Sequence, residues 1–299
     1  SVIGVYLAIA AATLLIGNPA VAEWANGLNL PWLSKFIDPA TLPWRLAFAL
    51  GLLPALLTIW IRRSLREPER WQAAQSRADQ NPAERMGAIS ELFQGELRQR
   101  TCIGVLLAAI GLGTFWGAHI YGKDMLRSAA SRQAVDNEPT DPAALKRWEM
   151  LGMFLVTTGG GLGLVAFGPI AQRIGRRGAF AVFQLGGLVS TIVVFQFLES
   201  AAALMVALPV FGFLTLGMHA GFAVYFPELY PTRLRGTGSG FCFNAGRILA
   251  APTLFAMGWL QDRRGYELPD AATLLSLLFV VGLIILPFAP ETRGQELRD

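Results

Sequence analysis

Long apolar segments alternate with short polar ones along the chain. A helix needs about 20 apolar residues to cross a bilayer, and eight segments approach or reach that length. They are Val2 to Ile16, Trp44 to Ile61, Cys102 to Ile120, Trp148 to Ile170, Ala179 to Leu198, Ala201 to Phe226, Gly236 to Leu260 and Ala271 to Phe288. The pattern predicts an all-α membrane protein with about eight transmembrane helices.

A charged segment with two prolines, Pro227 and Pro231, separates the sixth and seventh apolar segments. Proline cannot continue a helix and restricts the residue before it. Gly236 has no side chain and permits a tight start to the next helix. The segment therefore predicts a short turn between two membrane helices, which end near Phe226 and begin near Gly236.

Small residues recur at a spacing that favours close helix packing. Gly217 and Gly221 stand four residues apart, as do Gly236 and Gly240. In membranes this spacing lets two helix backbones approach each other. We expect both pairs to lie at helix contacts.

The composition agrees with a membrane protein. Charged residues make up 15% of the chain and hydrophobic residues 53%, whereas soluble domains carry about 25% charged residues. The net charge of +4 is modest, so we expect no nucleic-acid partner. Cys102 and Cys242 stand alone in apolar segments, which predicts buried free thiols, no metal site and no cofactor.

The distribution of Lys and Arg predicts the orientation. When the Lys and Arg residues are summed over alternate connections, 15 of them lie on one side of the membrane and 8 lie on the other. The positive-inside rule places the richer side in the cytoplasm. The Pro227 turn and both ends of this chain would then be cytoplasmic in a multi-pass inner-membrane protein. The polar stretch from Ser128 to Pro142 is expected to be an external loop. The segment Pro82 to Gln99 fits either an amphipathic helix on the cytoplasmic face or a plain linker.

Four landmarks in order give the chain a family resemblance. They are Trp44-Arg45 with Phe48-Ala49-Leu50-Gly51 and Pro54, then Arg66-Glu67-Pro68-Glu69-Arg70-Trp71, then Gly168-x-x-x-Gln172-Arg173-x-Gly175-Arg176-Arg177, and Pro227-Glu228-x-x-Pro231-Thr232-x-x-Arg235-Gly236 with Pro290-Glu291-Thr292-Arg293-Gly294. Together they resemble the major facilitator superfamily of transporters, and the second is similar to the signature of its sugar porter branch. The resemblance covers nearly the whole chain.

The resemblance implies twelve helices in two bundles of six. On this alignment residues 1–65 hold the last two helices of the N-terminal bundle. Residues 66–100 form a cytoplasmic linker, and residues 101–299 form the C-terminal six-helix bundle with a short tail. The first four helices would be absent from this chain, which predicts a fragment. The alternative is a genuine eight-helix protein whose cavity another chain completes.

Transporters of this kind work by alternating access, in which one face closes while the other opens. The resemblance assigns a cytoplasmic gating role to residues at helix ends, where ion pairs could hold one state. These residues are Gly168, Gln172, Arg173, Gly175, Arg176, Arg177, Glu228, Arg235, Glu291 and Arg293. The alternative is that their charges only set topology and stay solvated. Gln172 departs from the usual Asp and lacks the negative charge with which that Asp would join such a latch.

Polar residues inside membrane helices are costly, which makes them functional candidates. The candidates for the substrate or proton pathway are Trp116, His119, His219, Asn244 and Arg247. Histidine can carry a proton near neutral pH, and Arg247 could hold a carboxylate in a two-point contact. The alternatives are an interfacial position for His119 and simple core packing for His219.

The leading functional hypothesis is secondary active transport of a small polar solute, coupled to protons. The segment Leu106 to Ile120 lacks the Gln and Asn that the sugar porter branch usually carries there. Thr114-Phe115-Trp116-Gly117 looks more like relatives that move organic or sialic acids, which favours a carboxylate over a sugar. The alternative is a non-transporting membrane receptor or scaffold on the same fold. An enzyme is disfavoured, because Gly117-x-x-x-x-Gly122-Lys123 lacks the Ser or Thr and the strand of a phosphate-binding loop.

Overall fold

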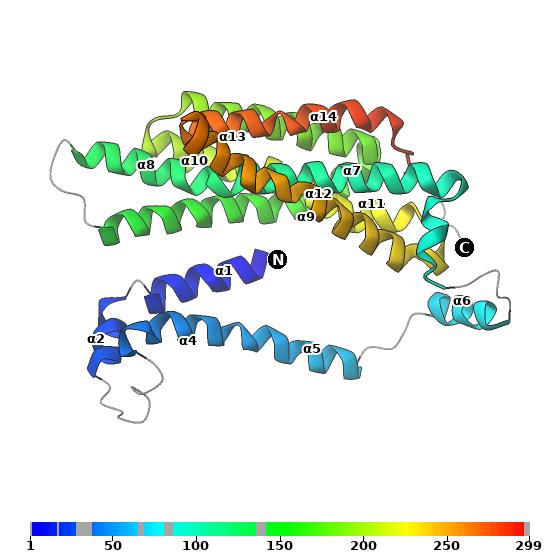
Figure 1. The fold of residues 1–299 in the computed structure, drawn as a ribbon, viewed down its shortest axis with the longest axis horizontal. Coiled ribbons are helices and arrows are strands. Elements are labelled where there is room, and N and C mark those ends of the chain that lie inside the picture. Colours follow the sequence, from blue (N-terminus) through cyan, green and yellow to red (C-terminus); the bar gives the residue numbers. More distant parts are fainter. Residues whose placement is uncertain are drawn as a thin grey trace.

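The computed structural model describes residues 2–16, 18–27, 38–64, 69–80, 86–135 and 142–295. Every regular element in these ranges is a helix, so the predicted all-α fold is confirmed. Figure 1 shows a smaller group of helices at the N-terminal end of the chain lying beside a larger bundle.

The smaller group begins with helix α1. Its elements are α1 (Val2–Ala11), a π-helical continuation (Ala12–Ile16), α2 (Pro19–Gly27), a 3-10 turn (Pro39–Thr41), α4 (Leu42–Leu50) and α5 (Leu52–Ser64). Helix α1 contacts the larger bundle along α9, where the Tyr6 hydroxyl donates to Thr158 Oγ1 over 2.8 Å. This contact places the start of the chain against the middle of the bundle (Figure 1).

The larger bundle follows α6 (Glu69–Gln80) and a short 3-10 helix (Ile89–Phe93). Its helices are α7 (Gly95–Gly117), α8 (Gly122–Val135), α9 (Pro142–Ile192), α10 (Ala201–Gly217), α11 (His219–Glu228), α12 (Arg235–Arg264), α13 (Leu268–Ser276) and α14 (Leu278–Ile285). Short helical turns at His119–Tyr121, Val193–Phe197, Thr232–Leu234 and Leu286–Phe288 join or extend them.

Helix α9 is two helices that meet at Gly175. The backbone of Gly175 has φ 85° and ψ 167°, which is not helical. Glycine adopts positive φ without the steric penalty of a side chain. The predicted segments Trp148 to Ile170 and Ala179 to Leu198 therefore lie on either side of this break, as the sequence pattern indicated.

Five helical stretches are long and apolar enough to cross a membrane. They are Leu42–Ser64, Gly95–Gln133, Pro142–Phe197, Ala201–Glu228 and Leu268–Phe288. The bent pair Val2–Ile16 and Ala20–Gly27 makes a sixth if it counts as one span. The difference from eight has two sources: Pro142–Phe197 contains two of the expected segments, and α12 is not among the stretches that pass. A helix nevertheless occurs in each of the eight expected segments.

The prediction of an external loop from Ser128 to Pro142 was wrong in part. Residues Ser128–Val135 belong to helix α8 and not to a loop, while residues 136–141 lie outside the described part. Residues 82–85 are also outside it, and the rest of the segment up to Gln99 forms the Ile89–Phe93 turn and the first residues of α7. The linker helix is α6, earlier in the chain. The motif residues Arg66, Glu67 and Pro68 fall outside the described residues.

The turn at Pro227 agrees with the sequence prediction. Helix α11 ends at Glu228 and α12 begins at Arg235, with one 3-10 turn between them.

Glycines set the closest helix contacts. A Cβ added at Gly217 would lie 2.2 Å from the Phe183 ring, and one at Gly221 would lie 2.5 Å from the Phe167 ring. The first predicted pair is thus packed as expected. A Cβ on Gly236 or Gly240 would meet no described atom within 4 Å, so the second pair makes no such contact in the described part of the chain.

The two cysteines differ. Cys242 is buried and lies 3.0 Å from the Tyr230 hydroxyl, whereas Cys102 is exposed, contrary to expectation. Cys102 lines a cavity of about 440 Å³ together with residues of α12, including Phe241 and Ala245. Its neighbour Ile103 is buried in the core.

Candidate functional site

An ion pair joins the turn inside α9 to the end of α11. Arg176 Nε lies 3.0 Å from Glu228 Oε2, and Arg176 Nη2 lies 2.7 Å from Glu228 Oε1. Both side chains are mostly buried, with 13% and 18% of their surface exposed. A parallel two-point contact of this kind fixes orientation as well as distance. It holds the reversal at Gly175 against the Pro227 turn.

Glu291 completes this cluster from the C-terminal tail. Its carboxylate accepts backbone N–H groups from Arg176 at 2.9 Å, Arg177 at 3.1 Å and Arg293 at 3.0 Å. Thr292 donates its hydroxyl to Glu228 at 2.5 Å. The tail is thereby fastened to both turns through neighbouring carboxylates.

The surroundings of Glu291 favour its charged form. Burial of the side chain opposes ionisation, but the hydrogen bonds from these backbone N–H groups outweigh it and hold the pKa of Glu291 below its ordinary value. A Cβ on Gly175 would lie 2.7 Å from Glu291 Oε2. Glycine at this position therefore serves both the backbone conformation and the approach of the carboxylate.

Two other predicted gating residues contact backbone carbonyls. Arg177 donates its Nε to the Ala289 carbonyl, and Arg235 donates its Nε to the Pro227 carbonyl at 3.2 Å. Gln172, Arg173 and Arg293 have exposed side chains. Gly168 meets no described atom at its Cβ position. The centre of the cluster is thus Arg176, Glu228 and Glu291.

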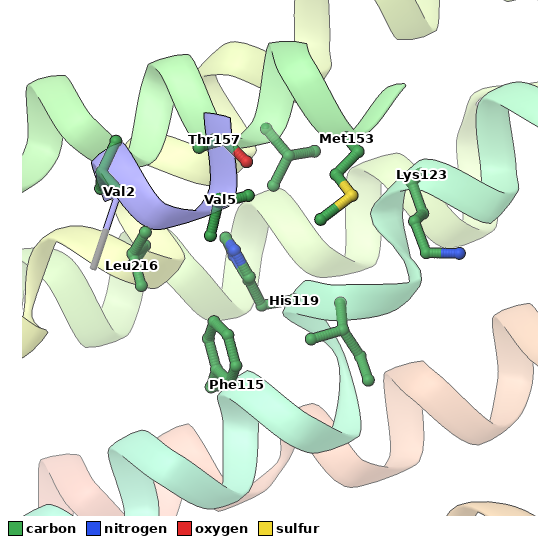
Figure 2. Close-up of a pocket in the computed structure, with 10 residues that line it drawn as sticks. Val2, Val5, Phe115, His119, Lys123, Met153, Thr157 and Leu216 are labelled. Atoms are coloured by element: carbon green, nitrogen blue, oxygen red, sulfur yellow. The ribbon is translucent and has the colours of Figure 1, made fainter. Parts of the chain in front are cut away.

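A cavity of about 160 Å³ lies between α1 and the larger bundle. Its polar lining residues are His119, Lys123 and Thr157, and the rest of the lining is apolar. His119 is 6% exposed and points into the space between Val5 and Phe115 (Figure 2). The cavity is therefore bounded by both groups of helices.

Hydrogen bonding fixes the orientation of His119. Its Nδ1 lies 2.6 Å from Thr215 Oγ1, and Thr215 donates its hydroxyl to the Phe211 carbonyl at 2.6 Å. Because a hydroxyl has one proton, Thr215 can only accept from His119. Nδ1 therefore carries a proton, and Nε2 is left as the nitrogen that can gain or lose one.

His219 and His119 both contact the ring of Phe115. The Phe115 ring stacks on His119 at 4.9 Å between centroids and meets His219 edge-on at 5.6 Å. His219 Nδ1 lies 3.1 Å from the Leu216 carbonyl, which can only accept, so this nitrogen is also protonated. His219 Nε2 is buried and has no hydrogen-bond partner among the described residues. The structure thus brings the two predicted histidines together.

The remaining predicted pathway residues lie elsewhere. Trp116 is 38% exposed and does not line the cavity. Asn244 is exposed and donates to the Gly240 carbonyl of its own helix at 2.8 Å. Arg247 is exposed, and its guanidinium lies 5.0 Å from the centre of the Phe243 ring. These three residues do not join the histidines in the described structure.

Sequence reasoning missed Thr215, Thr292 and the buried Glu149. A hydroxyl four residues before His219 carries no signal of its own, because its role depends on a contact with a distant helix. Glu149 follows Lys146 and Arg147 closely, and that charge pattern could have marked it. No group of three His, Cys, Asp or Glu side chains suited to a metal occurs in the described ranges.

Comparison with known proteins identifies the family. The family model of the Major Facilitator Superfamily matches residues 1–253. The chain belongs to this superfamily. Membership confirms the resemblance and the membrane fold, and it places the chain among transport proteins and not among enzymes.

Several members of the Major Facilitator Superfamily are similar to this chain. A probable 4-methylmuconolactone transporter of Cupriavidus pinatubonensis is 26% identical over 92% of the chain and 59% of its own length. A cis,cis-muconate transport protein of Acinetobacter baylyi is 26% identical over 73% of the chain and 50% of its own length. A minor myo-inositol transporter of Bacillus subtilis is 25% identical over 94% of the chain and 63% of its own length. The chain thus spans about half to two thirds of the length of these relatives.

Proposed function

We propose that the protein is a secondary transporter that carries a small organic carboxylate across the membrane together with a proton. The observation that supports this most directly is the cavity between the two groups of helices, which His119 lines, together with His219 on the same Phe115 ring. Alternating access needs a solute site where two bundles meet. The cavity beside His119 has that position.

His119 offers a way to couple proton and solute. Its Nδ1–H is committed to Thr215, so protonation occurs at Nε2. A protonated ring has a positive charge and a second N–H donor, both of which favour a carboxylate, whereas the neutral ring has a lone pair at Nε2 that repels it. Proton binding and carboxylate binding then support each other. His219 is the second proton carrier, because its Nε2 has no partner in the described structure.

The cytoplasmic assignment supports the gating proposal. We place the Arg176 cluster and both ends of the chain on the cytoplasmic side of an inner membrane, following the positive-inside rule. Arg176, Glu228 and Glu291 hold the tail and two turns together in one arrangement. A gate needs such an arrangement in at least one state.

Two of the three relatives described above are named for a muconate or a muconolactone, and the third is named for myo-inositol. The names support a carboxylate solute without deciding it. The protein, expressed from its complete coding sequence and reconstituted in vesicles, is tested for uptake of cis,cis-muconate and of myo-inositol. We expect muconate uptake that an inward proton gradient accelerates. Uptake of inositol alone would overturn the carboxylate assignment.

Further variants separate the roles. His219→Asn should flatten the pH dependence of uptake, and an unchanged profile removes His219 from the proton path. Arg247 remains a proposed carboxylate partner, because an exposed guanidinium in an apolar helix suits an anion. Arg247→Ala should abolish uptake without reducing membrane insertion. Muconate binding with no uptake under any gradient would favour the receptor or scaffold alternative.

A further inference from the structure

A second cluster of charges lies near the start of α9, at the other end of its first segment from the Gly175 break. Glu149 is 7% exposed, and three cations surround its carboxylate: Lys123 at 2.8 Å, Lys146 at 3.1 Å and Arg127 at 3.6 Å. Lys123 also contacts Asp124 at 3.0 Å. Three positive charges face two negative ones, so the cluster has an excess of one positive charge and favours anions.

Lys123 connects this cluster to the His119 cavity. Lys123 follows His119 by one helical turn and lines the same cavity. Its ammonium points away from His119 (Figure 2), and it lies 2.8 Å from Glu149 Oε1. The backbone of Lys123 is held close to α9, because a Cβ on Gly152 would lie 3.0 Å from Lys123 Cα. The flexible stem of Lys123 therefore spans from the cavity to the charge cluster.

We infer that Lys123 is an anchoring point for the carboxylate of the solute at the mouth of the His119 cavity. When the solute binds, Lys123 releases Glu149 and pairs with the carboxylate of the solute instead. Glu149 keeps Lys146 and Arg127 as partners, so the exchange leaves no buried charge unpaired, which would be costly. By the positive-inside rule this mouth faces the outside. The inference rests on the proposed function and names a further residue for it.

A purely structural role for the cluster makes a different prediction. If the cluster only fastens α8 to α9, loss of any partner of Glu149 weakens the fold and reduces binding in the same direction. If Glu149 competes with the solute for Lys123, removal of the lysine and removal of the carboxylate act in opposite directions. Paired substitutions can therefore separate the two roles.

The test measures binding of cis,cis-muconate to the protein in lipid nanodiscs. Lys123→Gln should raise Kd about tenfold, the usual scale for loss of one close charge pair. Glu149→Gln should lower Kd by about threefold, because it frees Lys123 from its competitor. Lys146→Gln is the matched control. It contacts the same carboxylate but does not line the His119 cavity, and its Kd should stay within about twofold of the wild type.

The possible results distinguish failure of the anchoring site from failure of the proposed transport. Equal Kd values for wild type and Lys123→Gln overturn the anchoring site, as does weaker binding in Glu149→Gln and Lys146→Gln alike. Normal binding without uptake overturns the proposed transport and leaves the anchoring site standing. Absence of muconate binding in the wild type overturns both. If Glu149→Gln does not fold, the comparison of Lys123→Gln with Lys146→Gln still decides.

Discussion

Arg176 and Glu228 form a two-point ion pair across 52 residues of sequence, with N–O distances of 3.0 and 2.7 Å. The pair joins the glycine reversal of α9 to the proline turn after α11. Arg177, the next residue, has an exposed side chain, so neighbouring arginines in one motif have separate tasks. The double basic residue of the sequence thus divides into one side chain that pairs with a carboxylate and one that donates to the Ala289 carbonyl.

Substitution of either partner should destabilise the bundle. Arg176→Gln or Glu228→Gln leaves a partly buried charge without its partner, which we expect to cost about 2 kcal/mol of unfolding free energy. The double variant should cost less than the two single variants together, because it removes both charges. The measurement is thermal unfolding in detergent, combined with uptake in vesicles.

The neighbouring Arg173 supplies a control for this comparison of single and double variants. Its side chain is exposed, so Arg173→Gln should change stability by less than about 0.5 kcal/mol. Additive losses in the double variant would contradict a direct interaction between Arg176 and Glu228.

Gly175→Ala should disturb the same cluster through the backbone. Gly175 has φ 85°, and a Cβ there would lie 2.7 Å from Glu291 Oε2. We expect a loss of about 1–3 kcal/mol, from strain and from displacement of the carboxylate. Gly168→Ala, in the same motif, has open space at its Cβ position and is the control. Equal unfolding temperatures for the two variants would refute this account.

Glu291 should make the stability of the protein depend on acidic pH. Its folded-state pKa lies below the ordinary value of 4.5, because backbone hydrogen bonds outweigh burial. The stabilisation is therefore complete above about pH 4.5 and is lost as pH falls through the lower folded-state pKa. Glu291→Gln should remove this component, so the difference in unfolding temperature from the wild type should shrink on acidification. If the difference in unfolding temperature stays constant from neutral pH downward, Glu291 does not make the stability depend on pH.

Local chemistry made part of this arrangement predictable. The break between the apolar segments Trp148 to Ile170 and Ala179 to Leu198 predicted a charged connection, because the charges favour the membrane surface. The partners of Arg176 lie 52 and 115 residues away, and no spacing rule connects them. The role of Glu291 as an acceptor of backbone N–H groups could not be deduced from its charge.

The boundaries of the membrane helices were less predictable than their existence. Ser128–Val135 carries polar residues, yet it continues as helix α8, because Ala, Arg and Gln have high helix propensity and because Ala129 and Ala130 pack into the core. His119 and His219 were both predicted as candidates, but their meeting at Phe115 depends on how α7 packs against α11. Arg247 was predicted as a candidate for the same pathway, and its guanidinium lies over the Phe243 ring.

Thr215 should control uptake through the orientation of His119. Thr215→Val keeps the size of the side chain but removes the acceptor for His119 Nδ1–H. The ring then loses its fixed orientation, and we expect maximal muconate uptake to fall about tenfold with an altered pH profile. Thr215→Ser restores the hydroxyl and should recover both. A Val variant with the wild-type pH profile would show that Thr215 serves packing only.

The contact between α9 and α10 should depend on glycine more strongly than the other described helix contacts of the bundle do. A Cβ on Gly159 would lie 1.8 Å from the Pro209 carbonyl oxygen, and one on Gly212 would lie 2.0 Å from the Val156 carbonyl oxygen. Both obstacles are backbone atoms, which cannot move aside without separating the helices. Gly159→Ala should therefore cost about 3 kcal/mol or more and reduce the yield of folded protein. Gly240→Ala, with open space at its Cβ, is the matched control. Gel-filtration yield and unfolding temperature measure the difference, and a Gly159 variant as stable as the Gly240 variant would rule out this close backbone contact.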